Sequence, residues 1–126
     1  MTTPYERMGG EAGVRAFTQR FYALMDTLPE AAPARAIHPA SLIQAEQKLF
    51  EYLTGWLGGP PLFTDKYGHP MLRRRHLHAP IGTEEIAAWL LCFRRAWAET
   101  VTDEELTQFV CPQIERLAIH MQNRTA

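Results

Sequence analysis

Histidines and arginines concentrate in one stretch of the chain. His69, His76 and His78 lie within residues 62–82, and residues 73–75 are all arginines. The histidines are separated by six residues and then by one, a spacing that matches no usual zinc site, and neither cysteine is close in sequence. A run of arginines can bind an anion such as a carboxylate or a phosphate. The histidines and the arginine run are also typical of a solvated basic loop. The residues by themselves therefore leave open whether this stretch is a metal site, an anion site or a solvated loop.

Three other side chains combine an aromatic ring with a polar group. Trp89 lies at the centre of an apolar helical stripe, and a buried indole needs an acceptor that its apolar neighbours do not offer. Tyr22 lies about a hundred degrees away from the apolar stripe of its own helix, which is typical of an exposed tyrosine. His38 precedes a proline at a helix end, where a surface capping role is usual. Each residue alone is therefore compatible with an ordinary structural role.

The apolar residues recur at intervals of three or four, which predicts helices. The expected long helices cover residues 11–28, 41–57, 83–100 and 103–122, and the expected short ones cover residues 31–37 and 70–76. Helical periodicity is weak over residues 62–82, and no alternating strand pattern bounded by hairpin turns occurs in the sequence. The predicted fold class is therefore all-α.

Capping residues predict where three of these helices begin. The expected N-terminal caps are Ser41, Thr83 and Thr102, each followed by Gln or Glu within three residues. Pro112 lies inside the last helix, where it removes a backbone donor and crowds the preceding turn. We therefore expect a kink or a break between residues 108 and 112.

Length and composition restrict the class of protein. The 126 residues predict one domain over residues 1–126, and 46% hydrophobic with 21% charged residues is not the composition of a disordered chain. No apolar run approaches the roughly 18 residues of a transmembrane helix, and no signal peptide is recognised. The net charge of -1 argues against a nucleic-acid-binding protein. Cys92 and Cys111 are expected to be free thiols, which together with the missing signal predicts a cytoplasmic protein.

Several short motifs occur in an order that resembles a known family. They are Gly9-Gly10, Arg20-Phe21-Tyr22, Gly58-Gly59-Pro60-Pro61, Tyr67-Gly68-His69-Pro70-x-Leu72-Arg73-x-Arg75-His76 and Ala88-Trp89-Leu90-Leu91-Cys92. This order resembles the truncated haemoglobins over about residues 5–122, and in particular their second group, which is marked by Trp89 in the helix after the haem-linked histidine. The resemblance implies a truncated globin fold, a two-over-two helical sandwich that encloses one haem b. The Gly-Gly pairs would then allow the sharp turns that so short a globin needs.

The resemblance assigns His76 as the proximal ligand of the haem iron, with the sixth position open for a gas. On the distal side the family pattern falls on Tyr22, His38, Ala45, Leu49 and Trp89. Ala45 stands where ordinary globins often place a distal histidine, so Trp89 is expected to be the main donor to a bound ligand, with Tyr22 and His38 adjusting it. His38 departs from members that carry Phe or Tyr at its position, and it makes the pocket more polar.

Further haem contacts follow from the same resemblance. Arg75 and Lys48 match positions that usually meet the haem propionates, and the Tyr67 hydroxyl is a further candidate donor to them. The side chains expected to pack on the porphyrin faces and rim are Leu49, Leu53, Phe63, Leu72, Ile81, Trp89 and Phe93. His69 and His78 keep their interpretation as loop residues.

The resemblance implies a protein that reversibly binds dioxygen and other small diatomic ligands, for transport, storage or sensing. The alternative is a haem enzyme for nitric oxide dioxygenation or peroxidase-type chemistry. Both need the same haem and the same donors, so the sequence does not separate them. Turnover would need an external reductase, which favours the binding hypothesis. We expect a monomer or a weak homodimer with no nucleic-acid or membrane partner.

Overall fold

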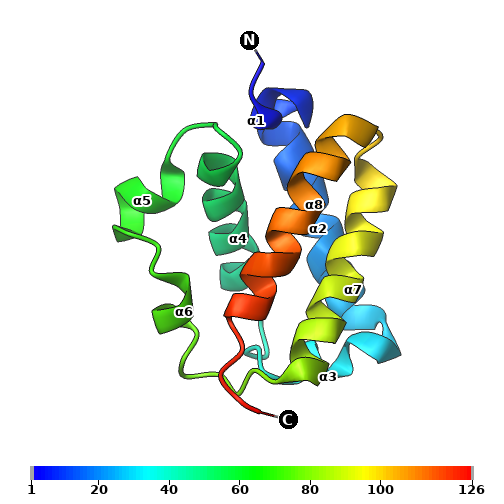
Figure 1. Ribbon diagram of the computed structural model, residues 1–126, viewed down its shortest axis with the longest axis vertical. Coiled ribbons are helices and arrows are strands. Elements are labelled where there is room, and N and C mark those ends of the chain that lie inside the picture. Colours follow the sequence, from blue (N-terminus) through cyan, green and yellow to red (C-terminus); the bar gives the residue numbers. More distant parts are fainter. Residues whose placement is uncertain (1, 126) are drawn as a thin grey trace.

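The computed structural model describes residues 2–125, and every regular element in that range is a helix (Figure 1). In chain order the elements are α1 (Pro4–Arg7), α2 (Gly10–Thr27), the 3-10 turn η1 (Pro29–Ala31), α3 (Ala32–Ala36), α4 (Ile43–Trp56), α5 (Leu62–Tyr67), α6 (Leu72–Arg75), α7 (Thr83–Thr100) and α8 (Glu104–His120). The predicted all-α class is confirmed. Each of the four long helices begins and ends within two residues of the predicted bounds. The prediction succeeds because an apolar stripe extends over most of the length of a helix that buries one face.

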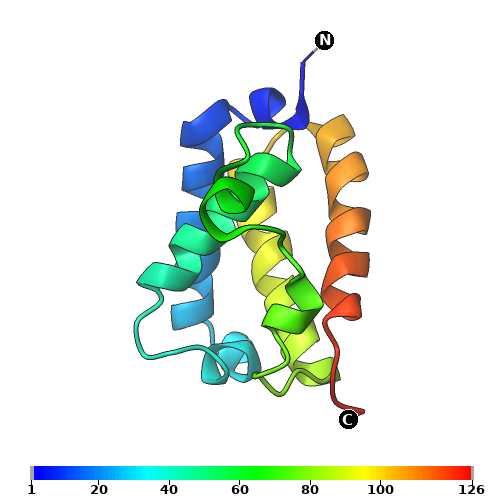
Figure 2. The same ribbon diagram turned by 90° about the vertical axis from the view of Figure 1, so that its left-hand side faces the viewer.

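The long helices form two layers. α2 packs against both α4 and α7, and α7 packs against α8, which is the expected two-over-two arrangement. The short helices α5 and α6 run along the side of this sandwich that faces the viewer in Figure 2. None of the helices in the described range is long and apolar enough to cross a membrane.

Aromatic rings fill the contact between α2 and α7. Phe17 is fully buried and meets the rings of Phe93 and Trp97 edge-on, with centroids 5.0 and 5.6 Å away. Edge-to-face pairs of this kind stabilise a core by about 0.5–1.5 kcal/mol beyond the area they bury. The indole nitrogen of Trp97 donates a 2.7 Å hydrogen bond to Thr107 of α8, so the polar atom of this buried ring is satisfied. The core therefore ties three of the four long helices together.

Glycine is required at the start of α2. Gly9 caps this helix with a φ of 106°, in the left-handed region that favours glycine. One turn later, a Cβ on Gly13 would come within 1.9 Å of the carbonyl oxygen of Met8. The prediction that the first Gly-Gly pair permits a sharp turn agrees with this geometry, which lets α1 fold back onto α2.

All three predicted caps are wrong by one residue, and the first two belong to α4 and α7. The cap of α4 is Leu42, whose side chain makes no capping bond, and Ser41 lies one position before it. The cap of α7 is Gly82 and not Thr83, which is already the first helical residue. The amide of Gly82 donates a 2.7 Å hydrogen bond to the Glu85 side chain, so half of a capping box forms without a serine or threonine. Several polar residues stand near each helix start, and which one caps depends on where the chain enters the helix.

The last helix departs from two expectations. Its cap is Asp103, whose carboxylate accepts a 3.0 Å hydrogen bond from the amide of Leu106, so the assignment to Thr102 is wrong. Helix α8 also continues through Pro112 without a break. The missing donor leaves the carbonyl four residues earlier without its helical partner, and that carbonyl lies on an exposed part of the helix where water can replace it. The expected break within residues 108–112 is therefore wrong.

Two short helices were not predicted. α1 is only one turn long, and it is capped by Thr3, whose hydroxyl oxygen accepts a 3.1 Å hydrogen bond from the amide of Glu6. α5 lies in the stretch of weak periodicity, where Phe63 is its only buried residue. A single turn carries too few apolar residues to show a period, so the sequence does not reveal such elements.

Candidate functional site

His76 lies at the C-terminal end of α6 and is exposed. Its ring Nδ1 is 2.6 Å from the carbonyl oxygen of Leu72, so Nδ1 carries the proton and donates it to that carbonyl. The lone pair of a neutral imidazole is then on Nε2, on the opposite side of the ring. A histidine whose other nitrogen is held by a backbone carbonyl is the form that ligates a metal ion. The geometry therefore fits the expected role of His76 as an iron ligand.

The segment that follows His76 is held by the chain beyond α8. The side-chain amide of Asn123 donates hydrogen bonds to the carbonyls of Ala79, at 2.9 Å, and of His76, at 3.4 Å. Its oxygen accepts a 2.9 Å hydrogen bond from the amide of Ile81. This residue was missed by sequence reasoning, because a lone Asn near the end of a chain carries no signal of a partner more than 40 residues earlier.

Arg75 binds the backbone of the loop before α6 through several hydrogen bonds. Its guanidinium donates hydrogen bonds of 2.6, 3.0 and 3.1 Å to the carbonyls of Pro70, Tyr67 and His69, respectively, and it lies 5.4 Å from the ring centroid of Phe63. The side chain therefore orders the turn that leads to His76. Its expected contact with a haem propionate stays a prediction.

Tyr67 has a different partner from the one expected. Its hydroxyl donates a 2.9 Å hydrogen bond to Glu51 of α4, and Lys66 approaches the other oxygen of that carboxylate at 3.2 Å. The single hydroxyl proton of Tyr67 is thus used within the protein in this structure, and its expected contact with a haem propionate stays a prediction. Lys48, the other expected propionate partner, is exposed with its ammonium 5.6 Å from the Tyr67 ring centroid, and its role stays a prediction.

Glu51 is a buried carboxylate that the sequence did not identify, since one acid in a helix is usually solvated. Burial by itself raises the pKa of this group, but hydrogen bonds from Tyr67, Lys66 and Gln47 and the positive charge of Lys66 lower it more. The net result is a pKa below the ordinary value, so Glu51 is ionised at neutral pH. This ion pair and hydrogen bond attach α5 to α4.

The distal candidates gather around one phenylalanine. The ring of Phe21 meets Tyr22 at 4.8 Å and Trp89 at 5.1 Å between centroids, edge-on in both cases. The ring of His38 in turn lies 6.0 Å from that of Tyr22. Trp89 is also stacked on Phe93, with centroids 5.6 Å apart. The structure therefore brings together Tyr22, His38 and Trp89, which are far apart in sequence. It also buries Tyr22, whose position on the helix predicted an exposed side chain.

The two tryptophans of α7 differ in their hydrogen bonding. Trp97 donates to Thr107, whereas the indole N–H of Trp89 has no acceptor among residues 2–125. Trp89 is half-buried, so its nitrogen is not a buried orphan, contrary to the fully buried ring expected from the sequence. Its ring is nevertheless held in place by Phe21 and Phe93. An indole in this position is a fixed donor that a small ligand can use.

At neutral pH the free ring nitrogen of His38 is an acceptor, and the expected role of this residue toward a bound ligand stays a prediction. Its Nδ1 lies 2.7 Å from the carbonyl oxygen of Ala34, so Nδ1 carries the proton and donates a hydrogen bond to that oxygen. Burial lowers the pKa of the ring, and the positive charge of Arg35 lowers it further, against the opposing effect of the bond to Ala34. Nε2 is therefore unprotonated near neutral pH.

Tyr22 keeps its proton at all ordinary pH values. Burial raises the pKa of its hydroxyl, and the negative charge of Glu46 raises it further. A protonated phenol beside a neutral imidazole can donate either to a ligand or to that imidazole. The distal group thus combines one fixed donor, one adjustable donor and one acceptor.

The apolar side chains expected to touch the haem are distributed over several elements. Leu53, Phe63, Ile81 and Phe93 are buried, whereas Leu49 and Leu72 are half-buried. The Phe93 ring stacks with Trp89 and with Trp97, at 5.6 and 5.7 Å between centroids. These haem contacts stay predictions. The donor set itself, with a neutral histidine nitrogen on one side and an indole and a phenol on the other, fits a haem and a small polar ligand.

Comparison with known proteins agrees with this assignment. Residues 3–123 match the family model of the bacterial-like globins. The chain is similar to the group II two-on-two haemoglobin of Agrobacterium tumefaciens, with 60% identity and a TM-score of 0.96 over 98% of this chain and 95% of that one. It is also similar to the cold-adapted truncated haemoglobin of Pseudoalteromonas haloplanktis, with 41% identity and a TM-score of 0.95 over 98% and 99% of the two chains. A truncated haemoglobin from Bacillus subtilis is 38% identical, with a TM-score of 0.87 over 97% and 100%.

The chain therefore belongs to the bacterial-like globins, among the group II truncated haemoglobins. Membership confirms the resemblance found in the sequence and the two-on-two fold. It also implies a haem cofactor and the binding of small ligands at its iron.

Proposed function

We propose that this protein binds dioxygen reversibly at haem b, with His76 Nε2 as the protein ligand of the iron. The ferrous iron of the haem supplies the bond to the gas. The chain supplies a neutral imidazole on one side, held by the Leu72 carbonyl, and hydrogen-bond donors on the other. The Bacillus subtilis relative is described as oxygen-avid, which supports dioxygen as the ligand.

The observation that carries this proposal is the indole N–H of Trp89. It has no acceptor within residues 2–125, although the ring is fixed between Phe21 and Phe93. Bound dioxygen carries partial negative charge and accepts such a hydrogen bond. Because the ring is already in place, no ordering is needed when the ligand arrives, so the bond slows release of the gas.

Release rates of dioxygen from the haem-loaded protein test the proposal. A hydrogen bond to a charged acceptor contributes about 1.5–3 kcal/mol, so Trp89→Phe is expected to speed release by roughly ten- to a hundredfold. Trp56→Phe is the matched control, because Trp56 is also a half-buried tryptophan but lies on α4 near Pro61. A release rate of Trp89→Phe within about twofold of the wild type would contradict the proposal, most clearly if Tyr22→Phe had a large effect instead.

A further inference from the structure

Positive charge is concentrated in two segments of this chain. Residues 66–82 and 116–125 contain six lysines and arginines and no aspartate or glutamate; the six are Lys66, Arg73, Arg74, Arg75, Arg116 and Arg124. The whole chain has 13 basic and 14 acidic residues. The rest of the chain therefore contains seven basic and all fourteen acidic residues, which gives it a net charge of about −7. A protein that is almost neutral overall therefore has a strongly uneven distribution of charge.

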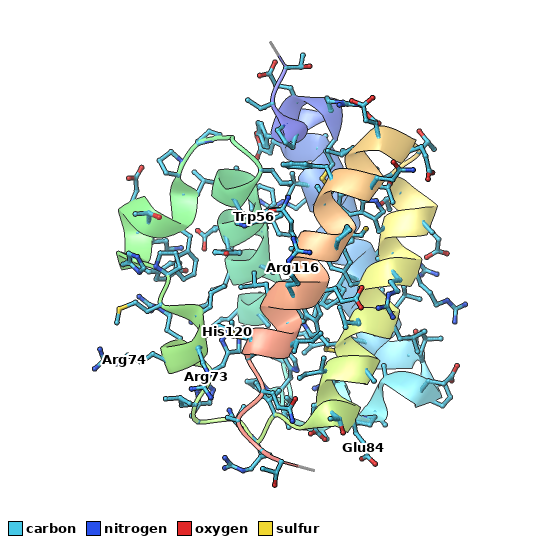
Figure 3. The ribbon with its side chains drawn as sticks, viewed as in Figure 1. Trp56, Arg73, Arg74, Glu84, Arg116 and His120 are labelled. Atoms are coloured by element: carbon cyan, nitrogen blue, oxygen red, sulfur yellow. The ribbon has the colours of Figure 1, made fainter. Side chains whose placement is uncertain are left out.

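The two basic segments form one surface, which we call the basic face. The guanidinium of Arg73 in α6 donates a 3.2 Å hydrogen bond to the carbonyl of Gln122, just beyond α8. Asn123 connects the same two segments through its bonds to Ala79 and Ile81. Figure 3 shows the labelled side chains of Arg73 and His120 on these two segments.

Most cations of the basic face have no carboxylate partner within residues 2–125; Lys66, which pairs with Glu51 at 3.2 Å, is the exception. Outside this face, Arg7, Arg20, Arg35 and Arg94 each form a salt bridge with a carboxylate. Within the described residues, none of the three arginines of α6 has a carboxylate within 4.0 Å, and neither has Arg116. Their charge is directed to solvent and to whatever approaches from it.

The basic face also surrounds the iron ligand. His76 follows the three arginines directly, and two large apolar side chains flank this stretch, Met71 with 42% and Leu77 with 48% of its surface exposed. Methionine and arginine are both enriched at protein interfaces relative to the rest of the surface. Short-lived complexes between electron-transfer proteins are small, and complementary charge speeds their encounter.

We infer that the basic face is the docking surface for an acidic protein that donates single electrons to the haem. This inference rests on the proposed function, because only ferrous iron binds dioxygen and a ferric haem must first regain one electron. In each encounter the donor is oxidised by one electron and the iron is reduced from ferric to ferrous, with no bond made or broken in the chain. The donor belongs to the class of acidic flavin or iron–sulfur proteins.

A compact acidic protein fits this surface better than a membrane or a nucleic acid. An extended polyanion also approaches the acidic remainder of the chain, which carries a net charge of about −7 by the count above. Proteins that bind nucleic acid are as a rule basic overall, whereas this chain has a net charge of -1.

Reduction of the ferric, haem-loaded protein by reduced flavodoxin, an acidic one-electron donor, tests the inference. The informative variants are Arg74→Glu on the basic face and Arg95→Glu on α7 outside it. Both side chains are exposed, neither has a carboxylate partner in the described part of the chain, and both substitutions change the net charge equally. We expect Arg74→Glu to slow the second-order reduction about tenfold at low ionic strength, with Arg95→Glu within about twofold of the wild type. The difference should vanish near 1 M salt, where charges are screened beyond roughly 3 Å.

Binding gives a readout that does not depend on turnover. In an NMR titration of the haem-loaded protein with oxidised flavodoxin, we expect amide shifts within residues 71–78 and 116–122 that are lost in Arg74→Glu. Equal reduction rates for the two variants would overturn the inference. So would Arg74-dependent binding to phosphatidylglycerol vesicles or duplex DNA while reduction by flavodoxin stays unchanged. Arg74 is not among the residues assigned to the haem or its ligand, so dioxygen release from Arg74→Glu should match the wild type. A failure of the Trp89 experiment is therefore distinguishable from a failure of this one.

Discussion

Glu51 offers a direct test of how α5 is attached to the rest of the globin. The substitution Glu51→Gln keeps the size of the side chain and an acceptor oxygen for the Tyr67 hydroxyl, but it removes the charge. In the structure the charged carboxylate accepts hydrogen bonds from Tyr67 at 2.9 Å and from Lys66 at 3.2 Å, and Glu51 is only 5% exposed. The variant therefore isolates the electrostatic part of the contact.

The expected loss of stability follows from these two bonds. A hydrogen bond to a charged group contributes about 1.5–3 kcal/mol and a neutral one about 0.5–1.5 kcal/mol, so the Tyr67 bond should weaken by about 1 kcal/mol. Lys66 is more than half exposed, and an exposed ion pair adds only about 0.2–1 kcal/mol. Together the free energy of unfolding should fall by roughly 1–2 kcal/mol near neutral pH.

Denaturant unfolding of the wild type, Glu51→Gln, Tyr67→Phe and the double variant measures this coupling as a double-mutant cycle. We expect a coupling energy of about 1 kcal/mol, together with faster loss of haem, because α5 and the turn before His76 become less ordered. Additive effects within about 0.3–0.5 kcal/mol would refute the reasoning, since independent sites behave in that way.

The same contact predicts a dependence on pH. The pKa of Glu51 in the folded protein is below its ordinary value of 4.5, so ionisation of this group favours folding. Its contribution is fully present above the unfolded pKa and is lost as the pH falls through the folded value. The stability difference between the wild type and Glu51→Gln should therefore be constant near neutral pH and shrink only in the acid range below about 4.5. A difference that shrinks near pH 6 would point to a histidine and not to Glu51.

The remaining predictions concern the two histidines of the site. His76→Gly should abolish stable haem binding, or leave an iron that added imidazole restores to a five-coordinate ferrous spectrum; a normal spectrum in this variant, with loss in His69→Gly or His78→Gly, would contradict the assignment. Because the pKa of His38 is lowered from its ordinary 6.5, dioxygen release should be independent of this group from pH 6.5 upwards and should slow below it, where the ring becomes a donor. Stopped-flow release rates across this range, compared with His38→Phe, measure the effect, and a transition above pH 7 that disappears in the variant would show that the pKa of His38 is not lowered.

The elements of this protein could be predicted because their signals are local. The four long helices each carry an apolar stripe of several turns, and the order of short motifs along the chain was enough to indicate a group II truncated haemoglobin and to select His76, Trp89 and Tyr22. A periodic stripe depends only on residues three and four apart, so it can be recognised without knowledge of the fold. One-turn helices such as α1 and α5 have no such period, and the exact caps depend on how the chain enters each helix.

The partners of the polar groups were decided only by the tertiary structure. Tyr67 donates a hydrogen bond to Glu51, Asn123 binds the segment after His76, and His38 donates a hydrogen bond to the Ala34 carbonyl. Two of these contacts join segments 16 and 44 residues apart, and the third depends on how a helix end is turned. Hydrogen-bond direction, burial and pKa all depend on which atoms meet in space. The sequence by itself therefore determined which residues are candidates for a haem site, and the fold determined the hydrogen-bond partners of these polar groups within the protein.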